Sequence, residues 1–452
     1  MADPIVAIVG AGPAGVRAAE MVARAGLTPI LFDEAEQPGG QIYRQPPKGA
    51  ARPGIYGLET KKAEAIHRVA PDLGNQIDYR PRTLVWNLFE DRLDLLRPEG
   101  YGDQRFDRLI LATGAMDRAL PFPGWTLPGA FTLGGAQIAL KAQGVAIGRR
   151  VAFVGAGPLL PLVAHQYAEA GADVVAVLDV TPFLAKLSQL PGLMTEAATL
   201  AKGLWYTARN RLHRLTVQYG VRAIRAEGSG QVEALVYRDK SGAEHRIACN
   251  AIAASFGLRS ETQLADLAGC RFVFDPIGRQ WLPERTPEGR STVPGLYLAG
   301  DGARIGGADM AELQGRRTAL ALLEDIGRPD AADETARLDG ALARQARFRE
   351  ALEKAYPFPA HLIDTVADGE IVCRCEGITA GALREAAREK DAGEMNRLKA
   401  LTRIGMGRCQ GRVCGHAAAE LLARARGVEV ESVGRLRAQP PVKPIPVLGS
   451  AP

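Results

Sequence analysis

The sequence predicts an α/β protein with two Rossmann-like dinucleotide-binding units and a small helical unit near its C-terminal end. Two segments, Ile5–Asp33 and Arg150–Leu178, each pass from an apolar strand through a glycine-rich turn into a helix and a second strand, which is the order of a βαβ unit. Four of the six cysteines lie within residues 373–414, in two close pairs. At 452 residues the chain is long enough for two or three domains with separate cores.

The composition is that of an ordinary globular protein, with 46% hydrophobic and 24% charged residues. Lys and Arg number 56 against 51 Asp and Glu, without a basic run, so nucleic acid is not an expected partner. No apolar stretch reaches the roughly 18 residues of a membrane-spanning helix. Because the first strand begins without a basic leader, we expect a cytoplasmic protein, and peripheral contact with the inner membrane stays open. In a reducing compartment, paired cysteines are expected to be ligands or redox groups.

The first glycine-rich turn has the pattern G-x-G-x-x-G in the setting that a dinucleotide requires. Gly10 makes the tight bend, Gly12 lets the backbone approach a pyrophosphate, and Gly15 lets helix and strand pack closely. Asp33 follows at the end of the second strand, where a carboxylate can accept the ribose hydroxyls. Glu34 is a second acid beside it and could share this role.

Two later strand-to-turn segments identify the nucleotide as FAD. Arg108–Gly114 and Thr292–Gly302 resemble the ATG and GD motifs of the glutathione-reductase-like flavoproteins with two dinucleotide domains, and the resemblance covers about residues 5–325. It implies that Asp301 binds the ribityl chain and that the helix after Gly306 points its N-terminus at the flavin. A helix N-terminus stabilises negative charge on a reduced flavin.

The same resemblance supplies the remaining contacts. The loop Gly39–Gln41 matches the one that approaches the isoalloxazine, and the turn Thr83–Leu84 stands where this family contacts adenine. The expected FAD-binding residues are Gly10, Gly12, Pro13, Ala14, Gly15, Asp33, Glu34, Gly40, Gln41, Leu84, Ala112, Thr113, Gly114, Gly300 and Asp301. No catalytic side chain is assigned, because His165, His213 and His416 are isolated in the sequence and no nucleophile or general base stands near the flavin motifs.

The second glycine-rich turn is degenerate. Gly155 and Gly157 are present, but Leu160 replaces the third glycine, where it would push the helix off the strand or fill the space of a pyrophosphate. Counting from Gly155, the position equivalent to Asp33 is Leu178, and Asp179 comes one residue late. We therefore do not expect NAD(P)H as the donor; a vestigial pocket that still holds an adenine nucleotide stays open. No Cys-x-x-Cys lies in this half, which excludes thioredoxin-reductase chemistry.

Two helical segments lie outside the nucleotide folds. Thr181–Leu215 has leucines at helical spacing and predicts an inserted helical hairpin, either packed as an elaboration of the core or used as a contact with another protein chain. Asp333–Tyr356 predicts a helix that leads to Pro357–Pro359, a linker signal.

The C-terminal cysteines form a C-x-C and a C-x₄-C pair, and the expected metal ligands are Cys373, Cys375, Cys409 and Cys414. Thiolates are soft ligands that suit zinc or an iron–sulfur cluster, but zinc sites typically use C-x₂₋₄-C pairs. The unit resembles the bacterioferritin-associated-ferredoxin-like [2Fe-2S] domain, although the second pair departs from the C-x₂-C of the free-standing ferredoxin. Zinc, or no metal, remains the alternative. Cys249 and Cys270 stand alone among apolar residues and are expected to be buried.

These observations divide the chain into five parts. The predicted FAD-binding domain is discontinuous and comprises residues 1–114 and 256–328. The other parts are a degenerate NAD(P)-type domain at 115–255, a helical linker at 329–368, the [2Fe-2S] domain at 369–428 and a Pro-rich tail at 429–452. The tail cannot form a helix and predicts either an extended arm across a partner or disorder.

The order of these parts resembles the α subunits of bacterial heteromeric amino-acid and opine dehydrogenases, which include opine oxidases, proline dehydrogenases and hydrogen cyanide synthase. The resemblance implies a D-amino-acid-oxidase-like flavoprotein β subunit that oxidises a C–N bond, and it allows for a small ferredoxin-like γ subunit. Electrons would pass through the cluster and this FAD to a quinone or other acceptor. The alternatives are a self-sufficient NAD(P)H-dependent reductase, a cyanide synthase subunit that oxidises glycine, and a zinc-stapled assembly protein.

Overall fold

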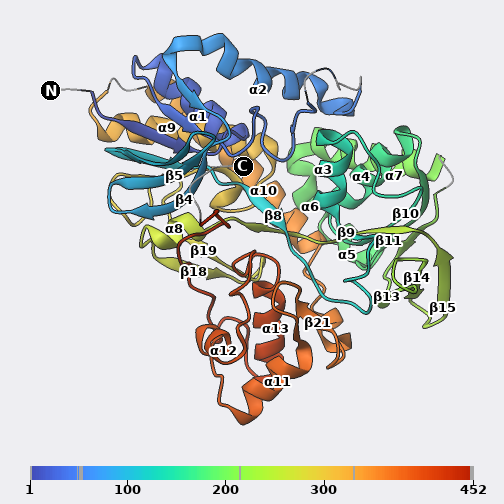
Figure 1. Ribbon diagram of the computed structural model, residues 1–452. Helices are drawn as coiled ribbons and strands as arrows, with labels where there is room; N and C mark the ends of the chain where they lie inside the picture. Colours follow the sequence, from blue (N-terminus) through green and yellow to red (C-terminus); the bar gives the residue numbers. More distant parts are fainter. Residues whose placement is uncertain (1–2, 48, 50–53, 213–214, 329–330, 448–452) are drawn as a thin grey trace.

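The computed structural model describes residues 3–47, 49, 54–212, 215–328 and 331–447. Figure 1 shows three units, with the first at the upper left, the second at the right and the C-terminal unit below both. Within the described residues, no helix is both long and apolar enough to cross a membrane.

A parallel five-stranded sheet, in the order β20-β7-β1-β2-β3, forms the centre of the first unit. Alternate residues of one strand enter two cores: Val6 and Ile8 pack with helices α1 and α9, whereas Ala7 and Val9 pack with the antiparallel sheet β4-β5-β6. The elements are β1 (Val6–Val9), α1 (Pro13–Arg24), β2 (Ile30–Phe32), α2 (Thr60–Leu73), β3 (Asp78–Arg80), β4 (Leu84–Phe89), β5 (Arg92–Arg97), β6 (Gly100–Arg105), β7 (Arg108–Leu111), β20 (Leu296–Leu298) and α9 (Ala308–Asp325).

The second unit repeats this plan around the parallel sheet β12-β11-β10-β16-β9. The chain enters it through β8 (Ala115–Asp117) and returns through β17 (Leu258–Ser260), and these two strands pair with each other. The sequence predicts the division between the units near these strands, at residues 114 and 256. The elements are β9 (Ala130–Thr132), α3 (Leu133–Ala142), β10 (Arg150–Ala156), α4 (Leu159–Glu169), β11 (Asp173–Asp179), β12 (Val217–Tyr219), β13 (Ala223–Glu227), β14 (Ala234–Arg238), β15 (Glu244–Ala248) and β16 (Ala251–Phe256).

The insertion after β11 consists of short helices followed by one longer helix, rather than a simple hairpin. Its elements are α5 (Phe183–Leu187), α6 (Leu190–Leu193), the 3₁₀ turn η3 (Met194–Glu196) and α7 (Ala197–Leu212). Leu193 is buried against Phe348, Ala351 and Ala355 of α10 (Ala332–Ala355), so one side of the insertion belongs to a core. The predicted 333–356 helix is thus present as α10.

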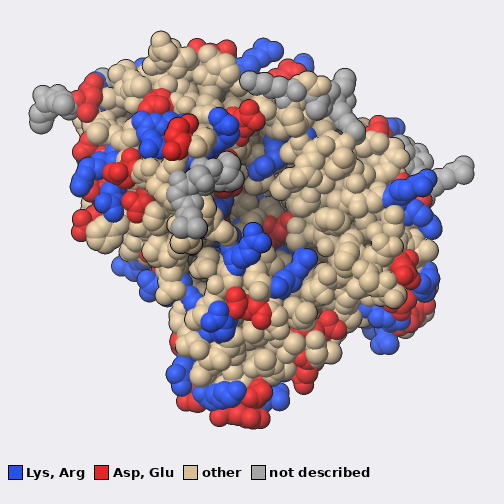
Figure 2. Space-filling view, in the orientation of Figure 1, with Lys and Arg blue, Asp and Glu red and all other residues tan. Residues whose placement is uncertain are grey.

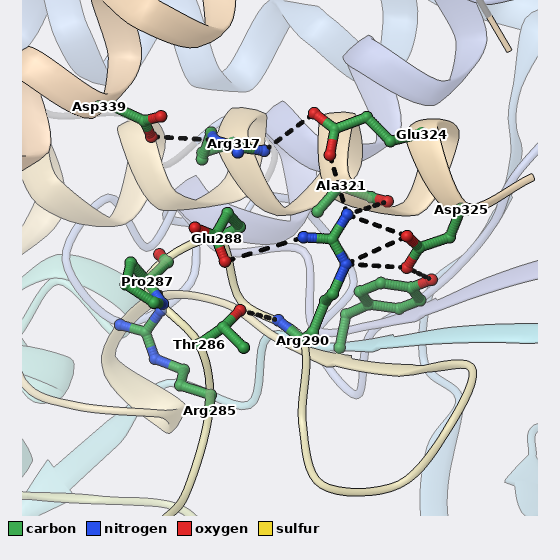
Figure 3. Close-up of polar contacts among 11 residues, drawn as sticks. Arg285, Thr286, Pro287, Glu288, Arg290, Arg317, Ala321, Glu324, Asp325 and Asp339 are labelled. Carbon is green, nitrogen blue, oxygen red and sulfur yellow. Dashed lines mark hydrogen bonds and ion pairs between the residues drawn. The ribbon is translucent and has the colours of Figure 1, made fainter. Parts of the chain in front are cut away.

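A network of arginines and carboxylates fastens α10 to α9 (Figure 3). The buried Arg317 donates from Nε to Asp339 of α10, at 2.9 Å, and pairs through Nη1 with Glu324, at 3.3 Å. Arg290, in the loop before β20, pairs with Glu324 at 2.8 Å and with Asp325 at 2.9 Å. The network therefore holds the N-terminal half of α10, and the C-terminal half of α10 reaches the second unit.

The C-terminal unit is a small helical domain with one β-hairpin. Its elements are β21 (Ile371–Cys373), β22 (Ile378–Thr379), α11 (Ala380–Glu389), α12 (Met395–Thr402) and α13 (Gly415–Arg426). The Thr379 hydroxyl accepts a hydrogen bond from the N–H of Ala382, so it is the N-cap of α11. Apolar residues of all three helices form its core, among them Leu383, Leu398 and Leu421.

The tail lies across the first unit of its own chain (Figure 1). Arg435 forms a two-pronged ion pair with Asp266, and the N–H of Val442 bonds to the carbonyl of Trp86 at 2.9 Å. Val442 is buried in the core beneath the first sheet, which contributes about 1.5 kcal/mol or more. The described part of the tail is therefore an extended segment held against its own chain, so the alternative of disorder does not apply to it, and contact with a partner stays a prediction.

Candidate functional site

A cavity of about 610 Å³ lies where the three units meet. Figure 2 shows the corresponding hollow in the front face of the molecule. Most of the residues that the sequence predicts for FAD line it: Gly10, Gly12, Pro13, Ala14, Asp33, Glu34, Gly40, Gln41, Leu84, Ala112, Thr113, Gly114 and Asp301. The second unit, α10, the C-terminal unit and the tail add further walls, so one space touches every part of the chain.

The glycines of the first turn fit the close approach of a phosphate. A side chain on Gly10, whose φ is +104°, would overlap the carbonyl oxygen of Ala112. Gly12 instead faces open space, with only the Cα of Gly40 within 4 Å of where a Cβ would stand. Gly15 and Gly300 do not line the cavity: a side chain on either would collide with a neighbouring segment, so both act through packing.

Asp33 stands at the end of β2 with its carboxylate held by the backbone. Its Oδ1 accepts from the N–H of Ala35 at 2.7 Å, and its Oδ2 accepts from the N–H of Ala11 at 2.5 Å. Burial raises the pKa of this carboxyl group. Glu34 is half exposed and pairs with Lys443 of the tail, so the tail engages the second predicted acid.

Asp301 shapes the opposite end of the cavity. Its Oδ1 accepts hydrogen bonds from the N–H groups of Gly306 and Gly307, at 2.7 and 2.9 Å, directly before α9 begins. The first residue of this helix, Ala308, lines the cavity, so the positive end of the helix dipole faces it. This geometry suits a group that becomes negative when it is reduced.

The second dinucleotide turn differs from the sequence prediction in one respect. Strand β11 bulges near Val175, so Asp179 pairs with Gly155 in the register that places Asp33 beside Gly10 in the first unit. The position equivalent to Asp33 is therefore Asp179, and the prediction of Leu178 is wrong. Like Asp33, Asp179 accepts from the N–H two residues on, at 2.8 Å. Leu160 is buried in the core beneath α4 and does not line the cavity, so it spaces helix and strand.

An internal lysine closes this second acid to a ligand. Lys186 of the insertion forms an ion pair with Asp179, and their side chains are only 15% and 5% exposed. The ammonium also lies over two rings, 4.4 Å from the centroid of Tyr219 and 4.6 Å from that of Tyr356. A ribose hydroxyl at Asp179 would have to displace this clasp. Sequence reasoning missed Lys186, because nothing in the spacing marks it.

The four predicted cysteine ligands come together beside the cavity. The Cys414 side chain is a hydrogen-bond partner of both Cys373 and Cys409, and this contact is the largest cause that lowers the pKa of Cys373 to about 6 and that of Cys409 to about 5. Cys375 lies against Cys409 and is exposed. The sulfurs thus form a chain, and among the described residues no three Cys, His, Asp or Glu side chains have the arrangement of a single-ion site.

Backbone N–H groups surround these sulfurs. Those of Cys375, Glu376 and Gly405 point at Cys373, and those of Gly411 and Val413 point at Cys409. Such hydrogen bonds stabilise thiolate and tune the potential of a cluster. Cys373 and Cys414 are buried, so the four sulfurs extend from the surface at Cys375 inwards. This donor set fits a four-thiolate cluster.

Arg412 joins the cysteine loop to the flavin-type motifs. Its Nε donates to Glu261 at 2.6 Å, and both residues line the cavity. The carbonyl oxygen of Glu261 accepts a hydrogen bond from the Thr113 hydroxyl at 2.5 Å, and the N–H of Glu261 donates to the carbonyl of Gly114 at 2.9 Å. Burial alone would raise the pKa of Glu261, but the guanidinium groups of Arg412 and Arg259 hold it below its usual value.

The isolated cysteines and the described histidines singled out in the sequence pack against other side chains. Cys249 and Cys270 are buried, as expected. His165 packs edge-on to Trp205, and His416 packs edge-on to Phe358. His213 lies outside the described residues.

Comparison with known proteins shows that the chain belongs to the family of the opine oxidase A chains. The family model for pyridine nucleotide-disulphide oxidoreductases matches residues 4–315, and the one for the BFD-like [2Fe-2S] binding domain matches residues 371–424. The opine oxidase A chain of Agrobacterium tumefaciens (strain Ach5) is 37% identical, over 97% of this chain and 89% of that protein. Hydrogen cyanide synthase subunit HcnB of Pseudomonas aeruginosa is 33% identical, over 97% of this chain and 96% of that protein. L-proline dehydrogenase from P. horikoshii shares the fold, with a TM-score of 0.73 at 20% identity, over 98% of this chain and 78% of that chain.

These matches establish an oxidoreductase-type chain with FAD and a [2Fe-2S] cluster as its cofactors. The open face at Gly12, the two acids Asp33 and Asp301 and the N-terminus of α9 fit the dinucleotide, and we propose that they hold it. Cys373, Cys375, Cys409 and Cys414 would hold the cluster.

The clasp on the second acid gives the first prediction. Lys186→Met should lower the free energy of unfolding by about 3 kcal/mol, because it leaves the Asp179 carboxylate buried without its partner. Adding Asp179→Asn should recover most of the lost free energy of unfolding, as measured by chemical denaturation. Lys202→Met is the matched control, because it removes another half-buried lysine of the insertion, which pairs with Glu59. Its loss of stability should be the same with and without Asp179→Asn. Equal losses in the single and double variants would contradict the clasp.

Proposed function

Because this chain belongs to the family of the opine oxidase A chains, we propose that it is the electron-transfer subunit of a heteromeric dehydrogenase acting on an opine or a proline-like amino acid. A partner flavoprotein of the D-amino-acid-oxidase type would oxidise the C–N bond. This chain would carry the electrons to a quinone or another acceptor, at a cytoplasmic location. When bound, FAD supplies two-electron chemistry and the cluster supplies one-electron steps.

One observation carries this proposal: the cavity with the FAD-type motifs is also lined by Arg412 and Val413, which lie between two of the cysteine ligands. The cofactor sites thus share a wall. On the far side, Cys375 is exposed, and Arg374 and Arg408 beside the ligands are exposed as well. A path from the surface to the cavity through the cysteine loop is what a relay needs.

The residues around this wall can position and tune the two centres. Arg259 donates to the carbonyls of Gly411 and Arg412, at 3.5 and 3.1 Å, and Gln263 donates to that of Gln410 at 2.8 Å. The strand β17 and the residues after it thereby hold the cysteine loop against the Thr113–Gly114 turn. The positive charges of Arg259 and Arg412 offset the charge of an all-thiolate site.

The clasped second acid argues against the self-sufficient NAD(P)H-dependent reductase, since Asp179 already binds Lys186. A cyanide synthase subunit that acts with a glycine-oxidising partner is the second candidate, and the 33% identity to hydrogen cyanide synthase subunit HcnB favours it. The two candidates differ in the partner's substrate.

The division of labour is tested with the purified chain. Alone, it should oxidise neither opines, proline nor glycine, and NADH should not bleach its flavin promptly under anaerobic conditions. Together with its proposed flavoprotein partner, it should reduce a quinone analogue when the substrate is added. Saturable amino-acid oxidation by the chain alone would refute the proposal.

The metal centre is tested by composition. Iron and labile sulfide should each amount to about two atoms per chain, without zinc. Cys414→Ser should remove the iron while FAD remains bound, whereas Cys249→Ser, at a buried cysteine far from the quartet in sequence, should retain both. Stoichiometric zinc in place of iron would contradict a relay.

The shared wall is tested at Arg412. Arg412→Gln and Glu261→Gln should each slow electron equilibration between flavin and cluster about tenfold or more, because each breaks the pair that seats the cysteine loop. Laser-flash reduction followed at flavin and cluster wavelengths measures this rate, and iron content serves as the integrity check. Arg403→Gln, at an exposed arginine paired with Glu376 in the same unit, should leave the rate unchanged. Unchanged equilibration rates in Arg412→Gln and Glu261→Gln would show that this ion pair has no role in the transfer of electrons between flavin and cluster.

A further inference from the structure

Residues 182–208 of the insertion form a broad surface without exposed charge, and the next residue, Arg209, has a 40% exposed side chain that pairs with Glu169. Across residues 182–208, all of which the structure describes, every exposed residue is uncharged. Large apolar side chains stand out from α5, α6, η3 and α7: Phe183, Leu184, Leu187, Leu190, Met194, Leu204 and Trp205. Leu184 is 74% exposed, Leu204 61% and Met194 57%. Figure 2 shows a largely uncharged area to the right of the central hollow, where Figure 1 places α3, α4, α6 and α7.

The three charged residues of this span are partly buried, and each lies near an opposite charge. Lys186 pairs with Asp179, Lys202, 27% exposed, pairs with Glu59 at 2.5 Å, and Glu196, 22% exposed, lies 3.9 Å from Arg344. About a quarter of an ordinary globular chain is charged, so a span in which every charged side chain is mostly buried differs from a solvated surface. Apolar residues with charge removed from the centre mark surfaces that another protein covers.

We propose that residues 182–208 form the docking surface for the substrate-oxidising partner subunit, which presents an uncharged, apolar face of its own. This inference rests on the proposed function, since the partner is the second subunit of the heteromeric enzyme. An anionic membrane surface is a poorer fit, because interfacial helices carry Lys and Arg on their exposed polar side and this span exposes none.

The position of the surface suits that partner. The insertion packs on α10 through Leu193, and residues of α10 in the same stretch, Arg349, Leu352 and Glu353, line the cavity. A protein docked on the insertion would be one helix layer from the cofactor cavity. The network of Arg317 and Arg290 fixes the other part of α10, so this layer is firmly held.

The test compares the double variant Leu184→Asp, Met194→Asp with Phe89→Asp. Phe89 is 59% exposed at the end of β4 in the first unit, so it controls for placing a carboxylate on an exposed apolar residue. Each chain is co-expressed with the proposed flavoprotein partner subunit, and complex formation is measured by mass photometry. We expect the double variant to weaken the heteromer at least about a hundredfold, since central apolar contacts each contribute tenfold or more. Phe89→Asp should assemble normally, and FAD and iron content should be equal in all three.

Hydrogen exchange supplies a readout that is independent of activity. In the wild-type heteromer, amides of residues 182–208 should exchange more slowly than in the chain alone. A heteromer that forms equally well with the double variant overturns the inference while leaving the proposed function standing. Dimers of the wild-type chain that the double variant dissolves would assign the surface to a second copy, and vesicle binding lost in that variant would assign it to a membrane. Amino-acid oxidation by the chain alone would instead defeat the proposed function, whatever the complexes show.

Discussion

The ion pair between Arg412 and Glu261 joins the C-terminal unit, the first unit and the tail at one point. Arg412 comes from the loop that carries two cysteine ligands, Glu261 bonds to the Thr113–Gly114 turn, and a second nitrogen of the same guanidinium donates to the carbonyl of Val442 in the tail. Both side chains are largely buried, so neither charge has water as an alternative partner. Without this contact the C-terminal unit would lose one of its polar attachments beside the cavity, and the two proposed cofactor sites would lose part of their common wall.

Local patterns in the sequence were sufficient for most of the first site. The βαβ order, the three glycines and Asp33 are set by contacts within about thirty residues, which spacing encodes directly. The cysteine quartet was predictable for a similar reason, since two short pairs must close on one centre. Arg259 and Glu261 could not be found this way. Their importance comes from contacts across some 150 residues of chain, such as the bond from Arg259 to Arg412, and nothing in their own neighbourhood marks them.

Two departures from these expectations show where counting residues fails. Equating Leu178 with Asp33 assumed an unbroken strand, but the bulge near Val175 consumes one residue and restores Asp179 to the acidic position. The tail was expected to be free or to reach a partner because proline-rich sequence forms no helix. An extended segment can still add backbone hydrogen bonds and bury a side chain, as Val442 does against the first sheet. In both cases a local irregularity was compensated by a contact that the sequence pattern does not contain.

Lys186 connects the closed nucleotide site with the uncharged surface. Turned inwards, its ammonium neutralises Asp179 and rests between Tyr219 and Tyr356, which removes the acid from the reach of a nucleotide. With Lys186 in this position, the exposed face of α5 consists of Phe183, Leu184 and Leu187 and carries no exposed charge. A lysine left in solvent at that point would oppose burial under a partner, because its charge would have to be desolvated. The proposed loss of the nicotinamide donor and the proposed docking face therefore depend on the same ion pair. Under the proposed function, such a chain takes its electrons from a protein donor in place of a small-molecule donor.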